Sequence, residues 1–361
     1  MTMPNLEDLT SFVERMGGDK ALRVEENLGQ GFVRLRVAEA ERRQAAHDIR
    51  HSEDIVIELL RNARDAGARH VFVATTKDAD RRVITILDDG AGIPRELWDA
   101  VFEARVTSKL ESVHMDRWGV HGRGMALYSV RQNTVSAEVM DSVVGGGTSL
   151  RVESDTSALP ERADQSTWPV VGRTDAGEAV IERGPHNIVR TCCEFALEEH
   201  GRCEVYLGSP AEIAATICQR IRSGATETDA LFVRDISSLP VLERFRHACD
   251  AVELMGIART CGLAMSERTA QRIISGQIRP VQSVYTRLLH PQEPRRQRGV
   301  RLDQDRRGLR LSDGDMQEFV SLMERDFAYL AERYYLTLTT KPRVRVSGNR
   351  LSVFFDCEGE D

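Results

Sequence analysis

ELLRNARDAG, residues 58–67, has the composition of an amphipathic helix with polar residues at regular intervals. Its polar residues Glu58, Asn62 and Asp65 are four and three positions apart, so a helix would place all three on one face. Such a stripe is usually no more than a solvated surface. Asn62 argues against that, because asparagine is a poor helix former and here has no cap or turn to serve. A solvated face and a functional site therefore both stay open as hypotheses.

The sequence around this stretch predicts a helix followed by a β-hairpin. Ser52 is a good N-cap for a helix that begins near Glu53, and Gly67 is a good stop. Two strand-like runs come next, HVFVATT and RRVITIL, joined by the polar KDAD. The helix also carries an apolar stripe that would pack on this hairpin: Ile55, Leu59, Ala63 and Ala66.

Two glycine-rich turns follow the hairpin. DDGAGIP, residues 88–94, closes the second strand, and its glycines allow a backbone excursion that other residues resist. The stretch from there to about Ser112 has weak periodicity and predicts a mobile loop. GVHGRG, residues 119–124, leads straight into a helix that starts near Gly124, an arrangement that suits a phosphate group. Two more strands are predicted after it, TVSAEVMDS and GTSLRVES.

Composition and charge limit the classes of protein that this chain can represent. Hydrophobic residues make up 41% and charged residues 29%, as in ordinary globular proteins. The net charge of -7 offers no general attraction to nucleic acid, so any such contact needs a local patch. The seven cysteines form no CxxC pair, which favours reduced thiols in a cytoplasm over disulfides or zinc. No apolar run reaches membrane-spanning length, and no membrane partner is predicted.

The chain is long for one compact core, so we expect several units. Residues 1–50 are predicted to be a helical extension ahead of a first domain at 51–155. The polar stretch at 156–169 is the best candidate for a linker. Beyond it the sequence predicts three further parts: an α/β segment at 170–238, a helical segment at 239–290, and an Arg-rich loop, long helix and C-terminal hairpin at 291–361.

The helix face, the Asp-Gly turn and the glycine-rich helix start together resemble the GHKL ATPases, the Bergerat-fold superfamily of histidine kinases, gyrase B subunits, heat-shock chaperones and MutL proteins. ELLRNARDAGA is similar to the MutL form of the first motif, DDGAGIP to the gyrase and MutL forms, and GVHGRG to the gyrase form. TSK at 107–109 resembles the lid segment of MutL and of topoisomerase VI B subunits. The resemblance covers roughly residues 30–155.

This resemblance implies an α+β fold. Its N-terminal part would be a two-layer α/β sandwich, in which a mixed, mostly antiparallel sheet carries helices on one face. A mixed α/β and helical C-terminal region would follow. The segment at 170–238 would then be a candidate for the relay domain that such ATPases place after the nucleotide domain.

The resemblance also implies catalytic and metal-binding roles. Glu58 would be the general base that orients the attacking water, and Asn62 would bind Mg²⁺ with support from Asp65. Lys109 would reach the γ-phosphate of ATP as a lid closes. Lys341 is a candidate for the lysine that a relay domain delivers to the same phosphate, since lysine is scarce in this chain. The alternative for Lys341 is a solvated lysine at the start of a hairpin.

The adenine and the phosphates would be held by the remaining matched positions. Asp88 would accept a hydrogen bond from the adenine amino group, and Thr148 would back the same pocket. The other implied ATP contacts are Gly90, Gly92, Ile93, Gly119, Gly122, Arg123, Gly124 and Met125. ATP and Mg²⁺ are therefore the expected cofactors. Such chemistry depends on a metal, backbone donors and a placed water more than on covalent catalysis.

Several activities are compatible with this domain. We expect a slow, Mg²⁺-dependent ATPase in which ATP closes a homodimer or a complex with a partner subunit, in topoisomerase-like or mismatch-repair-like DNA processing. The second hypothesis is a chaperone-like or regulatory clamp with negligible hydrolysis. A histidine kinase or anti-sigma kinase is disfavoured, because the water-activating Glu58 is present and His47 and His51 lie too close to it for a phosphoacceptor hairpin.

IARTCGLAMSERTAQRIISGQI, residues 257–278, has the spacing of a helix, a Cys261-Gly262 turn and a second helix capped by Ser266. It resembles a helix-turn-helix unit, although a generic three-helix packing unit has the same pattern. The predicted contacts to double-stranded DNA are Arg268, Gln271 and Arg272, with Arg295, Arg296 and Arg298 from the Arg-rich loop. A solvated loop is the alternative for the last three.

Overall fold

The computed structural model describes residues 24–45, 47–108, 114–116, 119–121, 124–162, 164–174, 179–223, 236–289, 313–347 and 350–359. The chain divides into two compact units, Met1–Pro291 and Gln292–Asp361, and each is described by itself. Of the helices in the described parts, none is long and apolar enough to cross a lipid bilayer.

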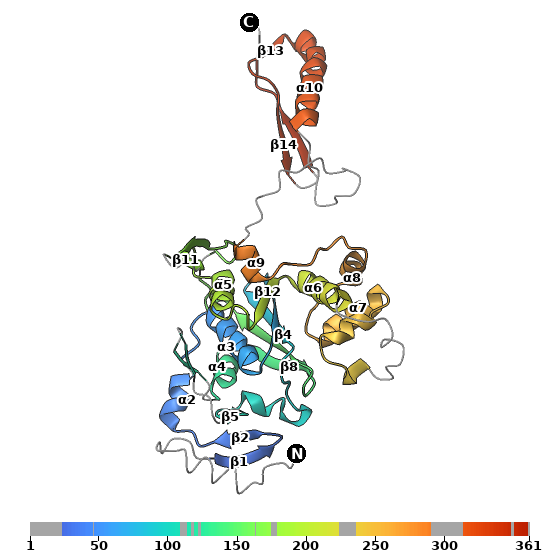
Figure 1. The fold of residues 1–361 in the computed structure, drawn as a ribbon. Helices are drawn as coiled ribbons and strands as arrows, with labels where there is room; N and C mark the ends of the chain where they lie inside the picture. Colours follow the sequence, from blue (N-terminus) through green and yellow to red (C-terminus); the bar gives the residue numbers. More distant parts are fainter. Residues whose placement is uncertain are drawn as a thin grey trace. The chain divides into compact units, whose positions relative to one another are not determined.

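A five-stranded sheet forms the centre of the first unit, in the order β12-β3-β4-β9-β8 (Figure 1). Its strands are β3 (His70–Asp78), β4 (Arg81–Asp88), β8 (Ser136–Ser142), β9 (Thr148–Asp155) and β12 (Glu204–Gly208). β12 runs parallel to β3, whereas the other three neighbouring pairs are antiparallel. The mixed, mostly antiparallel sheet predicted from the sequence is confirmed.

Helices cover the first face of this sheet. They are α3 (Ser52–Asp65), α4 (Ala126–Gln132) and α5 (Ile188–Glu198), which lie on the same side of the sheet (Figure 1). Val71 and Val73 of β3 and Ile84 and Ile86 of β4 belong to the apolar core on this side. Successive strand residues point to opposite faces, so these four residues share one face. This layer and the sheet form the two-layer α/β sandwich that the sequence predicts.

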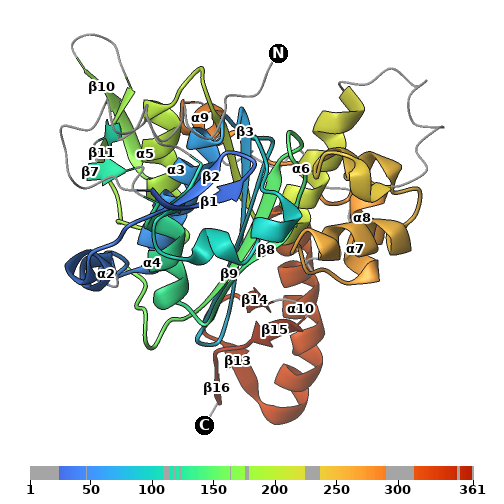
Figure 2. The same ribbon diagram turned by 90° about the horizontal axis from the view of Figure 1, so that it is seen from below.

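A second set of helices covers the opposite face, beyond the two layers predicted for residues 51–155. Figure 2 shows α6 (Pro210–Ser223), α7 (Ala251–Thr260) and α8 (Glu267–Ile274) on the side of the sheet away from α3 and α5. The alternate residues of the central strands, Phe72, Ala74 and Leu87, pack in this second core. A sheet that buries apolar side chains on both faces needs cover on both, and the sequence after 208 supplies it.

Helix α3 has the boundaries that the sequence predicts, with one correction at its start. Ser52 is the first helical residue and is fully buried, so it is not the cap. His51 takes that position, and the Asp54 carboxylate accepts hydrogen bonds from the backbone N–H groups of Arg50 and His51 at 2.8 and 2.9 Å. Gly67 ends the helix as predicted, with a left-handed φ of 75°.

The prediction of helix for the N-terminal extension is wrong over 24–35. These residues form β1 (Val24–Gly29) and β2 (Phe32–Leu35), an antiparallel hairpin whose second strand pairs with β5 (Val106–Thr107). Helix begins only at α2 (Glu39–Ala45). Val33 and Leu35 are buried on alternate positions, so pairing with a distant strand outweighs the helical propensity of the charged sequence around them.

The prediction of a mobile loop after DDGAGIP is also wrong for 95–107. Two short 3₁₀ turns, η1 (Arg95–Leu97) and η2 (Ala100–Phe102), precede β5. Their apolar side chains are at most 6% exposed and pack in the first core: Leu97, Val101 and Phe102. A 3₁₀ turn has a different period from an α-helix, so the helical pattern sought in the sequence is missing here.

The polar stretch 156–169 does not separate two units. Leu159 is buried, and Glu161 forms ion pairs with Arg82 and Lys77 of the β3–β4 hairpin. The connection that follows contains the hairpin of β10 (Val170–Arg173) and β11 (Ala179–Arg183) and then reaches α5. The segments predicted at 170–238 and 239–290 therefore complete the layers of the first unit instead of forming bodies of their own.

Several elements predicted for the second half of the chain are confirmed. Ser209 begins α6 with a reciprocal cap, in which its N–H donates to Glu212 at 2.9 Å. Helices α7 and α8 have the helix-turn-helix spacing, and α9 (Val284–Leu289) follows them. Residues 224–235 of the predicted α/β segment lie outside the described residues. The second unit contains the predicted long helix α10 (Asp313–Tyr334) and the hairpin of β14 (Arg343–Ser347) and β15 (Arg350–Phe354), with β13 (Leu336–Leu338) pairing β16 (Cys357–Gly359).

Candidate functional site

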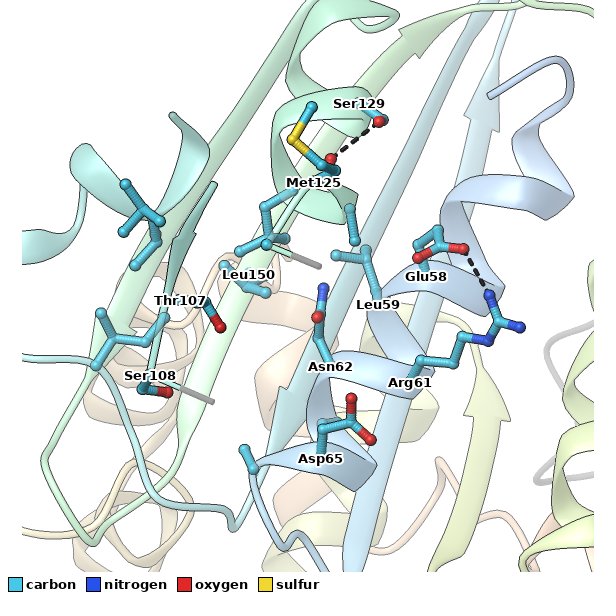
Figure 3. A pocket seen from close by; sticks show the side chains of 18 of the residues that line it. Glu58, Leu59, Arg61, Asn62, Asp65, Thr107, Ser108, Met125, Ser129 and Leu150 are labelled. Carbon is cyan, nitrogen blue, oxygen red and sulfur yellow. Dashed lines mark hydrogen bonds and ion pairs between the residues drawn. The ribbon is translucent and has the colours of Figure 1, made fainter. Parts of the chain in front are cut away.

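Helix α3 presents Glu58, Asn62 and Asp65 to a cavity of about 740 Å³ between the helix, the sheet and the start of α4. Figure 3 shows the three side chains on successive turns of one helix face. None of them is solvated in the manner of a surface stripe, since the side chains of Glu58 and Asp65 are only 20% and 6% exposed. The site hypothesis for this stripe is therefore favoured over the solvated face.

Asn62 occupies the centre of this face. Its amide nitrogen is buried and has no hydrogen-bond partner among the described residues. A buried amide without a partner costs about 1–3 kcal/mol, so its position calls for a ligand that supplies the missing contact. A ligand at this position would account for a poor helix former in the middle of a well-packed helix.

The two carboxylates beside Asn62 have arginine partners. Arg61 donates from Nη1 to Glu58 Oε1 at 2.8 Å, and the Arg61 side chain is only 4% exposed. Arg64 donates from Nε to Asp65 Oδ1 at 3.0 Å. Both carboxylates therefore have defined orientations at the rim of the cavity.

The opposite wall of the cavity comes from the ends of β4 and β9. Asp88 and Thr148 are paired across these antiparallel strands, and both line the cavity. Asp88 Oδ1 accepts a hydrogen bond from the Gly90 N–H at 2.8 Å, which fixes the carboxylate over the turn. The Thr148 hydroxyl lies 3.0 Å from Ser142 Oγ, and Ser142 also accepts from the Ile93 N–H at 2.7 Å.

Gly92 is required by the close approach of two turns. Its φ is 73°, and a Cβ there would lie 1.9 Å from the Val143 carbonyl oxygen. Gly147 is in the same situation, because its φ is 89° and a Cβ would lie 2.1 Å from the Asp88 carbonyl oxygen. A side chain at either position would push the strand ends apart and open the wall that carries Asp88.

Asp89, next to Asp88, ties this turn to the start of β3. Burial works against its ionisation, but hydrogen bonds from the His70 side chain and from the backbone N–H groups of His70 and Arg69 outweigh it and lower the pKa of this carboxyl. The contacts are 2.7 Å from His70 Nδ1, 2.8 Å from His70 N and 2.7 Å from Arg69 N. The charged form of Asp89 therefore holds the turn in place.

The third side of the cavity lies at the start of α4. Gly124 and Met125 line it, and Gly124 has a φ of 68°. The Arg105 N–H donates to the Gly124 carbonyl oxygen at 2.8 Å, so the end of the glycine-rich turn lies beside β5. The prediction of a turn is wrong for the first half of GVHGRG, because Gly119 lies in β7 (Gly119–His121), which pairs with β6 (His114–Asp116). Lys109, Gly122 and Arg123 lie outside the described residues.

The structure thus brings together most of the predicted nucleotide set. The predicted residues that line one cavity are Glu58, Asn62, Asp65, Asp88, Gly92, Ile93, Gly124, Met125 and Thr148. Gly90 bonds to Asp88 and supports the same wall. Lys341 is an exposed residue of the second unit.

Of the predicted DNA contacts, Arg268, Gln271 and Arg272 are exposed on α8. The predicted cap is present, because Ser266 Oγ accepts from the Thr269 N–H at 3.2 Å. The remaining three, Arg295, Arg296 and Arg298, lie outside the described residues.

Four residues that line or support the cavity are not singled out by any pattern in the sequence. Arg61 directly precedes Asn62, Arg105 stands two positions before the TSK segment, and both line the cavity. Ser142 and Gly147, at the two ends of the connection between β8 and β9, support the wall through their contacts with Thr148 and Asp88. Only the pairing of β4 with β9 places that connection against DDGAGIP.

Comparisons with known proteins agree with this geometry. The sequence of residues 47–158 matches the family described as "Histidine kinase-, DNA gyrase B-, and HSP90-like ATPase". The chain is 44% identical over 130 residues to the DNA mismatch repair protein MutL of Thermus aquaticus, covering 35% of this chain and 24% of that protein. It is 31% identical over 137 residues to the MutL of Chlorobium phaeovibrioides, covering 37% of this chain and 22% of that protein.

The chain therefore spans about a quarter of the length of these MutL proteins, and the similarity is confined to one part of it. Among solved structures, the mycobacterial sensor histidine kinase MprB aligns at 21% identity over 34% of this chain and 75% of that chain, with a TM-score of 0.22 that is too low to bear on the fold. The family match covers α3, the DDGAGIP turn, the start of α4 and the strand pair that closes the cavity. Residues 47–158 therefore match the family of histidine kinase-, DNA gyrase B- and HSP90-like ATPases.

Proposed function

We propose that the cavity binds ATP together with Mg²⁺ and that the protein is a slow ATPase. The observation that carries this proposal is that one cavity has two suitable walls. One contains Asn62 on α3, whose amide nitrogen has no partner in the part of the chain that the structure describes, and the other contains Asp88 at the end of β4. One wall offers a metal ligand and the other a carboxylate acceptor for the adenine amino group. The volume of about 740 Å³ is within the range of small-molecule sites.

The side-chain groups that α3 presents to the cavity are suitable ligands for magnesium. Mg²⁺ prefers oxygen ligands, keeps several of its waters and usually takes one or two ligands from the protein together with phosphate oxygens. The Asn62 side chain is an amide whose oxygen and nitrogen are exchanged by a simple flip, so the group without a partner can present its oxygen to the metal. When bound there, the metal would neutralise charge on the phosphates.

Glu58 is the proposed general base. Its carboxylate would take a proton from a water molecule while the water oxygen attacks the γ-phosphorus and the bond to the ADP oxygen breaks. Arg61 holds the Glu58 carboxylate at 2.8 Å and so restricts its orientation. Gly124, at the start of α4, would bring backbone groups close to the phosphates.

A first experiment separates the roles of Glu58 and Asn62. ATP hydrolysis and ATP binding are measured for Glu58→Gln, Asn62→Ala and the exposed control Glu138→Gln. We expect Glu58→Gln to lose roughly 100-fold or more in turnover while still binding ATP, since general bases contribute about that factor. Asn62→Ala should lose both properties, and the control should lose neither. Normal hydrolysis by Glu58→Gln would contradict the assignment of the base.

Measurements on the wild-type protein decide between an ATPase and a regulatory or chaperone-like clamp. A clamp would bind ATP tightly while the wild-type protein releases no phosphate at saturating ATP. A histidine kinase would retain label from γ-labelled ATP on the protein. We expect phosphate release and no retained label, because Glu58 lines the cavity and has a fixed orientation.

We also propose that ATP closes a dimer or a complex with a partner subunit, and that the α7–α8 unit contacts duplex DNA. The relatives are named for DNA mismatch repair, and α8 exposes Arg268, Gln271 and Arg272 beyond a capped helix start. These side chains suit phosphates and base edges. Sedimentation with and without a non-hydrolysable ATP analogue tests closure, and an unchanged mass at all concentrations would contradict it.

DNA contact is tested by the salt dependence of binding. Arg268→Ala with Arg272→Ala should weaken binding to duplex DNA and reduce the slope of log affinity against log salt by about 2, since each phosphate contact releases counterions. Arg173→Ala is the matched control, because Arg173 is exposed on β10 and lies away from α8. An unchanged slope in the double variant would exclude α8 as the DNA surface.

A further inference from the structure

Arg105 is a buried cation in the wall of the cavity. It is only 3% exposed, and it directly precedes β5. Its φ of 64° lies in the left-handed region, which is unfavourable for a residue other than glycine. Such a conformation persists where the surrounding structure demands it, and it is enriched at ligand sites.

Two backbone hydrogen bonds fix this residue beside the glycine-rich turn. The Arg105 N–H donates to the Gly124 carbonyl oxygen at 2.8 Å, and the Arg105 carbonyl oxygen accepts from the Leu35 N–H at 3.0 Å. The peptide of Arg105 thus joins β2 to the start of α4. Its position depends directly on Gly124, the residue at the proposed phosphate end of the cavity.

The guanidinium group of Arg105 is only partly satisfied. Nη2 donates to Glu41 Oε1 of α2, while Nε is buried and has no hydrogen-bond partner among the described residues. The other oxygen of Glu41 accepts from the Ala38 N–H at 3.1 Å, just before α2 begins. Glu41 therefore both caps α2 and neutralises Arg105, and its own side chain is 35% exposed.

The charged residues that line the cavity indicate that an anion could draw Arg105 away from Glu41. Among its described lining residues are two arginines, Arg61 and Arg105, and five carboxylates: Glu41, Asp48, Glu58, Asp65 and Asp88. Arg61 is held by Glu58 inside the protein at 4% exposure. Arg105 is instead paired with a carboxylate that is 35% exposed, so water competes with the guanidinium group for that carboxylate. A polyphosphate offers a guanidinium stronger, bidentate contacts than that carboxylate does.

We propose that Arg105 is a phosphate-binding residue that exchanges Glu41 for the polyphosphate of the nucleotide. This inference rests on the proposed ATP site. It adds one side chain that binds the phosphates and one change in the protein, the release of Glu41, when the nucleotide binds. Nucleotide binding breaks the Arg105–Glu41 pair and so loosens α2 from the cavity wall. In the nucleotide-free protein, Glu41 binds Arg105 in place of a phosphate group, and this pair keeps α2 at the cavity wall.

The test compares ATP and adenosine binding, by calorimetry, in the wild type, Arg105→Met, Arg105→Lys and Glu41→Gln. We expect Arg105→Met to weaken ATP roughly tenfold or more, the effect of losing one charge-assisted contact, with adenosine affinity unchanged. Arg105→Lys should recover part of the loss. Glu41→Gln should tighten ATP and leave adenosine unchanged, because it removes the competing charge. The controls Arg43→Met and Glu39→Gln alter an exposed pair on the same helix and should leave both affinities unchanged.

Each result is decisive for one proposal. If the wild type binds ATP but Arg105→Met binds it equally well, the phosphate role of Arg105 is overturned. If Arg105→Met does not fold, Glu41→Gln still decides, because an unchanged ATP affinity there overturns the exchange. Amide hydrogen exchange over residues 39–45 should rise when ATP is added, and unchanged exchange would overturn the release of α2. A wild-type protein that binds no ATP at all would instead refute the proposed function.

Discussion

Ser149 of β9 donates a hydrogen bond of 2.7 Å to the carbonyl oxygen of Cys261, in the turn between α7 and α8. Thr85 of β4 makes a similar bond of 3.1 Å to the carbonyl oxygen of Gly262. Both side chains are buried and point away from the cavity, whereas their neighbours Ile86 and Thr148 line it. The two strands that form the cavity wall on one face thus hold the helix-turn-helix turn on the other.

Removal of this link should destabilise the first unit. Ser149→Ala leaves the buried Cys261 carbonyl oxygen without its donor, which we expect to lower the free energy of unfolding by about 1–3 kcal/mol. Urea denaturation measures the change. Ser275→Ala, at an exposed position after α8, is the control and should stay within about 0.5 kcal/mol of the wild type. Equal stability of the two variants would show that the link contributes nothing.

Gly92 and Gly67 form a matched pair for testing the close approach of the two turns. Their φ values are 73° and 75°, so alanine brings similar backbone strain to both. Only at Gly92 does the new Cβ meet the Val143 carbonyl oxygen, at 1.9 Å, since nothing lies within 4 Å at Gly67. Gly92→Ala should therefore be less stable than Gly67→Ala by about 2 kcal/mol or more, measured by urea unfolding. Similar losses in both would mean that the turns move apart without cost.

The lowered pKa of Asp89 predicts acid sensitivity of the DDGAGIP turn. A carboxyl whose pKa is lower in the folded state stabilises it above the unfolded value of about 3.9 and loses that contribution as the pH falls through the folded value. Asp89→Asn should therefore be less stable than the wild type near pH 6, and the difference should shrink below about pH 4. Urea midpoints at several pH values measure this, and a difference that stays constant with pH would refute it.

We expect the magnesium dependence of ATP binding to require Asn62. Chelation of Mg²⁺ is expected to weaken ATP binding by the wild type, because charge on the phosphates then lacks its counter-ion. Asn62→Ala should bind ATP weakly in both conditions, with a loss of roughly 10–100-fold against the magnesium-loaded wild type. Calorimetric titrations with and without a chelator measure both effects. A variant that keeps the full response to chelation would show that another residue carries the metal.

The candidate site was predictable where its residues belong to local patterns. The spacing of Glu58, Asn62 and Asp65 on one helix face depends only on helical geometry, and Asp88 closes a strand within its own hairpin. Arg61 and Arg105 could not be assigned in this way. Whether an arginine is buried beside a carboxylate depends on which distant elements pack around it, as α2 does around Arg105.

Local patterns in the sequence specify α3, the β3–β4 hairpin, the DDGAGIP turn and the capped helix α8. Each of these depends on residues within a few positions of one another, and short-range propensity and periodicity decide them. Long-range packing is the reason that 24–35 form strands, that 156–169 pack against the hairpin, and that β12 adds to the sheet in parallel. Those outcomes depend on pairing and burial between residues far apart in the chain, and that free energy exceeds the local preferences that the sequence displays.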